Sequence, residues 1–336
     1  MIDETLLSII IPIYNTPENL LRNCLNSIEV QNNSHIEVLL IDDGSEEFCH
    51  NICLEYSLRN QNFLYYKHKN AGSSYTRNRG IELSKSDYLI FVDSDDTLED
   101  TAVETIIREI TENKIDLLIY NCRRYNSNNS IKDEHLLENN HIYMNETDKC
   151  KLYELLVYTH ELSLVTTKVY VKNIILKNNI YFSTDMKWGE DIAFNIDYFV
   201  CCDKIKYIDV VLYNHFYRSN SVVTQIELKK LKDLKKEYNK RLSLINLKFR
   251  ELQKNILVHK LKELILKEVF IFTANNLYIG AKKRDIKKMY KEINIYEILD
   301  ISNNKLKIKI LSILLKNNLL GLIKIAIHIK RFIKRG

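Results

Sequence analysis

The chain has 336 residues, of which 46% are apolar and 28% charged, and this composition excludes an intrinsically disordered protein. Its length exceeds what one hydrophobic core usually supports, so we expect a full domain followed by a second region. The net charge is +5, but residues 301–336 hold nine Lys or Arg and no acid. The rest of the chain is therefore slightly acidic, and the basic excess belongs to its C-terminal end.

The first 125 residues alternate short apolar runs with stretches of helical spacing. The apolar runs are rich in strand-forming residues and cover 6–14, 36–41, 63–66, 88–92 and 116–120. Helical spacing extends from Pro17 to about Val30 and covers 46–59, 73–84 and 97–113. Apolar strands separated by helices predict an α/β fold with a Rossmann-like, mostly parallel central sheet flanked by helices.

After residue 125 the sequence predicts a loop, a mixed segment and then a mainly helical C-terminal region. Residues 126–147 are polar and rich in Asn, which predicts a loop, and residues 148–223 return to mixed patterns. From about Ile226 to Lys267, apolar residues recur three or four positions apart among many Lys and Glu. This spacing predicts a long amphipathic helical region.

The last residues, 303–336, mix Ile and Leu with regularly spaced Lys. They contain no uncharged apolar stretch of 18 residues, so a membrane-spanning helix is not expected. A basic amphipathic helix of this kind is suited to lie on an anionic membrane surface, here the inner leaflet of the cell membrane. Packing on the preceding helices, or pairing of two subunits into a homodimer, is the alternative.

The seven cysteines and the N-terminus predict a cytoplasmic protein. The cysteines are odd in number and contain no CxxC pair, which indicates free thiols in a reducing compartment. Cys49 and Cys53 flank His50 but have no second pair of ligands at zinc spacing, so we interpret them as helix packing. Residues 1–4 include two acids where a secretory signal carries basic residues.

Polar or acidic clusters follow four of the predicted strands. They are Pro12-Ile-Tyr-Asn15, Asp42-Asp-Gly-Ser45, Asn70-Ala-Gly72 and Asp93-Ser-Asp-Asp96. Because the carboxyl ends of parallel strands meet at one edge of a sheet, we expect one pocket with several carboxylates. Clustered carboxylates repel one another unless a cation or hydrogen-bond donors offset them.

The chemistry of these clusters indicates a divalent cation and a diphosphate. Mg²⁺ or Mn²⁺ is commonly held by one or two carboxylates and completes its coordination with water and phosphate oxygens. The sequence contains neither GxxxxGK[ST] nor GxGxxG, so a P-loop or a dinucleotide fingerprint does not explain phosphate binding.

Together with Arg77-Asn-x-Gly80, these clusters in this order resemble family 2 of the inverting glycosyltransferases, of the bacterial surface-polysaccharide type. The resemblance is dense over 5–115 and continues to about residue 224 through Lys187-Trp-Gly-Glu-Asp191 and the segment Tyr213 to Ser221. It implies the A-type nucleotide-sugar fold. The implied domains are a catalytic domain at 1–224, with nucleotide-sugar binding in 1–115 and the acceptor and catalytic part in 116–224, a helical region at 225–302 and the basic tail at 303–336.

The resemblance also implies roles for single residues in the donor site. Those expected to contact the nucleotide sugar lie in the strand-end turns and at the start of the next helix: Pro12, Tyr14, Asn15, Asp43, Arg77, Asn78, Asp93 and Ser94. Asp95 is expected to bind the Mn²⁺ or Mg²⁺ that bridges the diphosphate, with Asp93 as a second ligand. Asp96 has no assigned role, and Thr97, Glu99 and Asp100 are expected only to begin the next helix.

Three further positions complete the implied reaction. Glu190 and Asp191 match the acidic pair that supplies the general base in this family, and Asp191 is the preferred base. Arg218 is expected to add positive charge to the diphosphate, with a plain surface arginine as the alternative. Trp188 is expected to stack on an acceptor sugar, with core filling as the alternative.

We therefore expect a metal-dependent inverting hexosyltransferase that uses UDP-glucose, UDP-galactose or an N-acetyl form. Its expected acceptor is a saccharide or lipid-linked saccharide in the synthesis of a capsule, O-antigen or lipooligosaccharide. The alternative is an inactive module that binds nucleotide sugar, but Asp95, Glu190 and Asp191 are all retained. Nucleic-acid binding is not expected, because acids are interleaved with the lysines through residue 268 and no reader motif is recognised.

Overall fold

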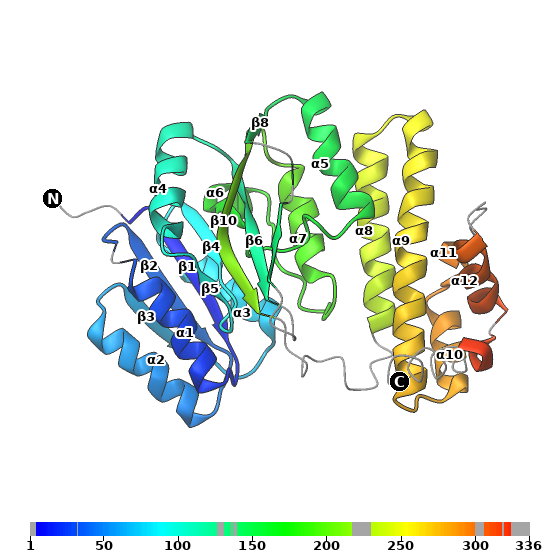
Figure 1. Cartoon of the computed structure of the whole chain (residues 1–336), viewed down its shortest axis with the longest axis horizontal. Helices are drawn as coiled ribbons and strands as arrows, with labels where there is room; N and C mark the ends of the chain where they lie inside the picture. Colours follow the sequence, from blue (N-terminus) through cyan, green and yellow to red (C-terminus); the bar gives the residue numbers. More distant parts are fainter. Residues whose placement is uncertain are drawn as a thin grey trace. The chain divides into compact units, whose positions relative to one another are not determined.

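The computed structural model describes residues 5–31, 33–125, 131–135, 137, 140–216, 230–299, 306–317 and 319–323 (Figure 1). The chain divides into two compact units. The first unit is formed by Met1–Lys149, Glu161–Asp185 and Glu190–Ser219, and the second by Cys150–His160, Met186–Gly189 and Asn220–Gly336. The predicted domain boundaries near 224 and 302 lie outside the described residues.

The first unit is built on one sheet, which has ten strands among the described residues. The strands are β1 (Leu7–Ile13), β2 (Ile36–Asp42), β3 (Phe63–Lys67), β4 (Tyr88–Phe91), β5 (Thr97–Leu98), β6 (Leu117–Tyr125), β7 (Ile131–Glu134), β8 (His141–Tyr143), β9 (Lys168–Val171) and β10 (Ile205–Phe216). Their order is β3-β2-β1-β4-β9-β6-β10-β5, with β7 on β6 and β8 on β10. Strands β1 to β4, β6 and β10 point the same way.

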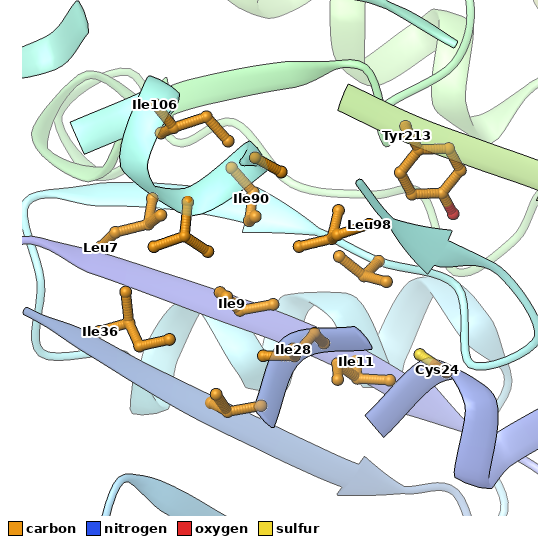
Figure 2. Close-up of a cluster of buried hydrophobic side chains, with 14 of the residues drawn as sticks. Leu7, Ile9, Ile11, Cys24, Ile28, Ile36, Ile90, Leu98, Ile106 and Tyr213 are labelled. Atoms are coloured by element: carbon orange, nitrogen blue, oxygen red, sulfur yellow. The ribbon is translucent and has the colours of Figure 1, made fainter. Parts of the chain in front are cut away.

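Helices cover this sheet, as predicted. They are α1 (Glu18–Glu29), α2 (Glu47–Arg59), α3 (Ser73–Leu83), α4 (Ala102–Asn113), α6 (Lys172–Lys177) and α7 (Glu190–Phe199). On one face, alternate side chains of β1 such as Ile9 and Ile11 pack with Ile28 of α1 and Ile106 of α4 (Figure 2). The mixed α/β architecture with a mostly parallel sheet is therefore confirmed.

On the other face, α3 lies very close to β1. A Cβ added to Gly80 of α3 would come within 2.3 Å of the Cγ2 atom of Ile10, so glycine is what permits this approach. Because Arg77 precedes Gly80 by about one helical turn, the same contact brings the N-terminal half of α3 to the edge of the sheet where β1 ends.

Two predicted elements are corrected. Thr97–Leu98 forms β5, because these residues pair antiparallel with Asn214 and Tyr213 of β10, and α4 begins only at Ala102. The predicted helix start at Thr97, Glu99 and Asp100 is therefore wrong. The polar stretch predicted as a loop contains β7, which pairs with the C-terminal half of β6, and β8, which pairs with the first residues of β10. Helix α5 (Glu146–Tyr158) begins before this stretch ends. The amphipathic helical region predicted from about Ile226 to Lys267 contains two helices, α8 (Lys230–Lys248) and the first part of α9 (Glu251–Tyr278).

The second unit is helical. Its helices are the end of α5 (Glu146–Tyr158), α8 (Lys230–Lys248), α9 (Glu251–Tyr278), α10 (Lys283–Glu292), α11 (Tyr296–Leu299) and α12 (Leu306–Lys316). Helices α8 and α9 form an antiparallel hairpin that turns at Phe249 and Arg250 (Figure 1). Across the described part of the chain, no helix combines the length and apolar character needed to cross a bilayer. All seven cysteines are free thiols, as predicted, and Cys49 and Cys53 are buried in the core.

Candidate active site

The loops that follow β1, β2 and β4 are cross-linked into one rim. The chain returns from β3 to β4 on the far side of β1, so the strand order reverses between β1 and β4, where ligands of open α/β sheets bind. Asn15 takes a left-handed conformation with φ +47, which asparagine tolerates. Its backbone N–H donates to Ser45 Oγ at 3.1 Å, and its side-chain Oδ1 accepts from the N–H of Glu46 at 2.8 Å.

Ser94 and Asp43 support this rim through bonds to other loops. The hydroxyls of Ser94 and Thr16 are 2.6 Å apart, which ties the end of β4 to the end of β1. The carboxylate of Asp43 accepts from the N–H of Ala71 at 2.6 Å and of Gly72 at 2.9 Å. Both side chains are buried, so in this structure their direct contribution is to shape the loops around the predicted donor site.

Arg77 joins the two acidic clusters that the sequence places 98 positions apart. Its Nη2 donates to Asp93 Oδ1 at 2.9 Å, and its Nη1 donates to Asp191 Oδ1 at 3.1 Å and lies 3.8 Å from Glu190 Oε1. The guanidinium is only 7% exposed, and its Nε is buried without a hydrogen-bond partner. One buried cation therefore faces three carboxylates, at the end of β4 and at the start of α7.

The electrostatics of this group favour a proton acceptor. Burial raises the pKa of Asp191 to about 7, Arg77 opposes the rise, and the neighbouring Glu190 and Asp93 add to it. The three carboxylates raise the pKa of Arg77 against the effect of its burial, so the guanidinium stays charged. A carboxylate with a pKa near neutrality is suited to take a proton and to release it again.

Asp93, Asp95 and Asp96 have separate environments in the turn after β4. Asp96 is buried and accepts from Tyr213 Oη at 2.7 Å and from the N–H of Phe216 at 2.9 Å. Its third partner on β10 is His215, whose Nδ1 lies 3.0 Å away and whose pKa Asp96 raises. Asp96 therefore anchors β10, whereas Asp93 and Asp95 are partly exposed at the rim.

Asp93 and Asp95 fit a divalent cation of the expected kind. Both present carboxylate oxygens, which Mg²⁺ and Mn²⁺ prefer. In the described part of the chain no three His, Cys, Asp or Glu side chains form a metal-binding group, so an ion here needs further oxygen ligands. Water and the oxygens of a diphosphate supply such ligands in many sites where one or two carboxylates hold the ion.

The remaining predicted site residues lie in different settings. Tyr14 is 55% exposed directly after β1, and Pro12 lies within that strand. The side-chain amide of Asn78 exchanges two 2.8 Å hydrogen bonds with the backbone of Phe182, so it holds that segment against α3. Arg218 lies outside the described residues.

Trp188 belongs to the second unit and packs there. Its ring meets Phe272 of α9 edge-on, with the ring centroids 5.0 Å apart, and Lys230 Nζ lies 5.4 Å from its centroid. The side chain is partly exposed. These contacts fit the core-filling alternative and leave the predicted acceptor contact untested.

Sequence reasoning missed two residues that shape the site. Tyr213 accepts from the N–H of Asp93 at 3.2 Å and donates to Asp96, so its hydroxyl links two members of the acidic turn. Lys168 of β9 is fully buried, and burial lowers its pKa to about 7 while the nearby Asp191 charge opposes the shift. Tyr213 begins a segment that resembles family 2, but the resemblance assigned it no role, and a lysine inside an apolar strand is not a specific signal.

Comparison with known proteins shows which proteins the chain resembles. Residues 8–172 match the family model described as glycosyl transferase family 2. GlyA, a glycosyltransferase of Streptococcus pneumoniae, is 31% identical over 225 residues, which cover 66% of this chain and 32% of GlyA. EpsJ of Bacillus subtilis, an uncharacterized glycosyltransferase, is 27% identical over 306 residues, which cover 88% of this chain and 85% of EpsJ.

A solved structure shows the same fold over nearly the whole chain. The crystal structure of Staphylococcus aureus TarS 1-349 in complex with UDP-GlcNAc has a TM-score of 0.68 at 19% identity, and the match covers 96% of this chain and 91% of TarS 1-349. This likeness shows the A-type fold, and the family model and the named relatives indicate the class of protein, a glycosyltransferase. More specifically, residues 8–172 match family 2 of the glycosyltransferases.

Proposed function

We propose that this chain is a metal-dependent inverting hexosyltransferase that takes its sugar from a UDP-sugar donor. The observation that carries the proposal is the Arg77 bridge, which joins the turn after β4 to the Glu190-Asp191 pair. The acceptor hydroxyl has to lie close both to the anomeric carbon of the donor and to the base that takes its proton. The donor site and the base must therefore be neighbours. The UDP-GlcNAc complex of TarS, which shares the fold, supports a uridine nucleotide as the donor.

Asp191 is the proposed general base. An acceptor hydroxyl has a pKa far above 7, so a positioned carboxylate has to take its proton as the bond to the anomeric carbon forms. With a pKa near 7, Asp191 is largely deprotonated at slightly alkaline pH and accepts that proton. Arg77 keeps the carboxylate in place and offsets the charge of its two acidic neighbours.

The donor is proposed to bind at the rim between β1 and β4. Tyr14 and Asn15, together with the loop that Asp43 holds, surround the base, and Asp93 and Asp95 face the diphosphate. Mn²⁺ or Mg²⁺ held by these two carboxylates supplies a Lewis acid for the negative charge of the leaving nucleoside diphosphate. Attack from the side opposite to the leaving group inverts the anomeric centre, and one base is sufficient for that course.

The acceptor is proposed to be a saccharide or lipid-linked saccharide of a bacterial surface glycan, reached at the inner leaflet of the membrane. The exposed side of α12 carries Ile310 and Ile313 beside Lys309 and Lys316, while Leu315 and Ser312 are buried on its other side. Exposed isoleucines flanked by lysines suit an anionic lipid surface, with each basic residue contributing about 1 kcal/mol.

The enzymatic part is tested with a panel of UDP-sugars, with and without Mn²⁺, by mass spectrometry of the released UDP. We expect metal-dependent release and transfer, loss of both in Asp95→Ala, and loss of transfer with retained UDP affinity in Asp191→Asn. Full activity in both variants contradicts the assignment. Calorimetric UDP-sugar binding with no turnover on any acceptor favours the inactive binding module instead.

The membrane part is tested by co-sedimentation with vesicles of anionic or neutral lipid. We expect binding to the anionic vesicles alone, weakened by salt and by Lys309→Glu with Lys316→Glu. Binding that is unchanged by salt and by the two substitutions, or no binding at all, contradicts the membrane part of the proposal. Neither result affects the proposed donor chemistry.

A further inference from the structure

A row of charged side chains is buried along one face of α8. Asp233, Glu237 and Arg241 follow one another at intervals of four residues, and none is more than 6% exposed. Buried ion pairs stabilise proteins little, because apolar side chains of similar volume often stabilise them as well or better. The row is therefore better explained by the segments of chain that it holds than by helix stability.

The first two residues of the row hold the segment Met186–Gly189. The N–H of Lys187 donates to Asp233 Oδ2 at 3.0 Å. Gly189 lies so close to Glu237 that a Cβ in its place would be 2.9 Å from Glu237 Oε2. Its φ of +75 also requires glycine, the residue that adopts this conformation at low cost. The segment is thus hydrogen-bonded to α8 at Lys187 and packed closely against it at Gly189.

Arg241 connects this contact to a second segment. Its Nη2 lies 2.7 Å from Glu237 Oε1, and its Nη1 donates to the carbonyl oxygens of Leu156 and, at 2.9 Å, Thr159. These carbonyls lie at the C-terminal end of α5, where a helix leaves carbonyls without intrahelical partners. One connected network therefore holds both short segments that the second unit takes from the earlier part of the chain.

We propose that Asp233 and Glu237 are positioning residues for the general-base pair. The segment they hold ends at Gly189, and the next peptide unit begins α7 with Glu190 and Asp191. Gly189 is joined to Glu190 by one peptide bond, so the network holds the chain directly before the first turn of α7. The inference rests on the proposed role of Asp191, and it assigns a catalytic purpose to charges that do not touch substrate.

The test compares two substitutions at one position. Asp233→Ala removes the acceptor of the Lys187 N–H, whereas Asp233→Asn keeps a side-chain oxygen that accepts it. We expect Asp233→Ala to lower kcat by about 10- to 100-fold, the size of loss that a misplaced catalytic group causes, and Asp233→Asn to recover most of it. Affinity for UDP, measured by calorimetry, should stay within about twofold in both variants, because the donor loops are untouched.

Glu251→Gln is the matched control. Glu251 lies at the start of α9 with its side chain 88% exposed, so this variant removes one carboxylate from the same unit without affecting the segment. Wild-type kcat is expected. Full kcat in Asp233→Ala, or equal loss in the Ala and Asn variants, overturns the inference.

Two further measurements keep the test decisive. If Asp233→Ala does not fold, Gly189→Ala displaces the same segment, and unchanged kcat in that variant also overturns the inference. Asp191→Asn separates the two levels of the argument. An active Asp191→Asn variant defeats the proposed base, whereas an inactive one beside a fully active Asp233→Ala defeats only the positioning role.

Discussion

The rim of the first unit and the charged row of α8 both contain carboxylates paired with a buried arginine, but the carboxylates have different roles. At the rim, Asp93 and Asp191 share one buried arginine and stay partly exposed, at 36% and 26% of their side-chain area. In the row, Asp233 and Glu237 are almost completely buried and bind backbone or arginine. Exposure therefore separates acids that are available to a substrate from acids that shape the backbone, and Asp96 falls in the second group.

The largest effect should come from removing the cation of the rim. Arg77→Ala leaves three carboxylates without their common partner, and loss of one member of a buried ion pair costs about 3–5 kcal/mol. We expect a lower melting temperature and a loss of transfer of about 100-fold or more. Arg79→Ala is the control, because Arg79 is exposed and forms an ion pair with Glu82 on the same helix. A stable, active Arg77→Ala variant contradicts the bridge.

The pH profile of transfer is the next largest effect. Because the pKa of Asp191 is raised to about 7, the carboxylate is protonated and inactive below that pH. We expect kcat to fall about tenfold for each pH unit below 7 and to reach a plateau above it. In Asp191→Asn the residual rate should lack this limb. A wild-type profile that is flat down to pH 5 contradicts Asp191 as the base.

A smaller effect on stability should separate the close contact between Gly189 and Glu237 of α8 from the backbone strain that any alanine at positive φ causes. Gly189 and Gly280 both have positive φ, but an added Cβ meets Glu237 only at Gly189 and meets nothing within 4 Å at Gly280. Each alanine should cost about 1–2 kcal/mol of backbone strain, measured by chemical unfolding. Gly189→Ala should cost more than Gly280→Ala, and equal losses would show that Glu237 does not press on the segment.

The smallest effect belongs to the exposed end of the acidic run. Asp100 is exposed and begins no helix, and its substitution by Asn removes one charge without breaking a described bond. We expect Asp100→Asn to change the free energy of unfolding by no more than about 0.5 kcal/mol, as for most surface substitutions. The activation free energy calculated from kcat should change by no more than the same amount. A large loss would extend the site beyond Asp93 and Asp95.

The sequence was sufficient to predict strands β1 to β4 and β6, because apolar strands and helical spacing alternate with unusual regularity through residue 125. It also placed Asp93 and Asp191 in one site, through the resemblance to family 2. It did not predict that Arg77 joins them, because a bond between α3 and α7 depends on how two helices pack on the same strands. Nor did it predict β5, since Thr97 is committed to a strand only by its partners on β10.

The charged row of α8 was also beyond sequence reasoning. Spacing by four residues predicts that Asp233, Glu237 and Arg241 share a face, but charged residues at that spacing usually face solvent. Only the position of residues 186–189 shows that this face is buried. A sequence motif contains the residues that contact a ligand. Charged residues that hold such a motif in place lie outside it, and their burial in the structure reveals them.

The close approach of Gly80 to Ile10 has a consequence for how related chains can vary. Any side chain at position 80 enters the space of the β1 residue beneath it, so the two positions should change together, with a larger residue in α3 matched by a smaller one in β1. The reach of Arg77 toward the rim is set by that spacing. Substitution at an apolar strand position with no polar atom is thus able to move the cation on which the acidic site depends.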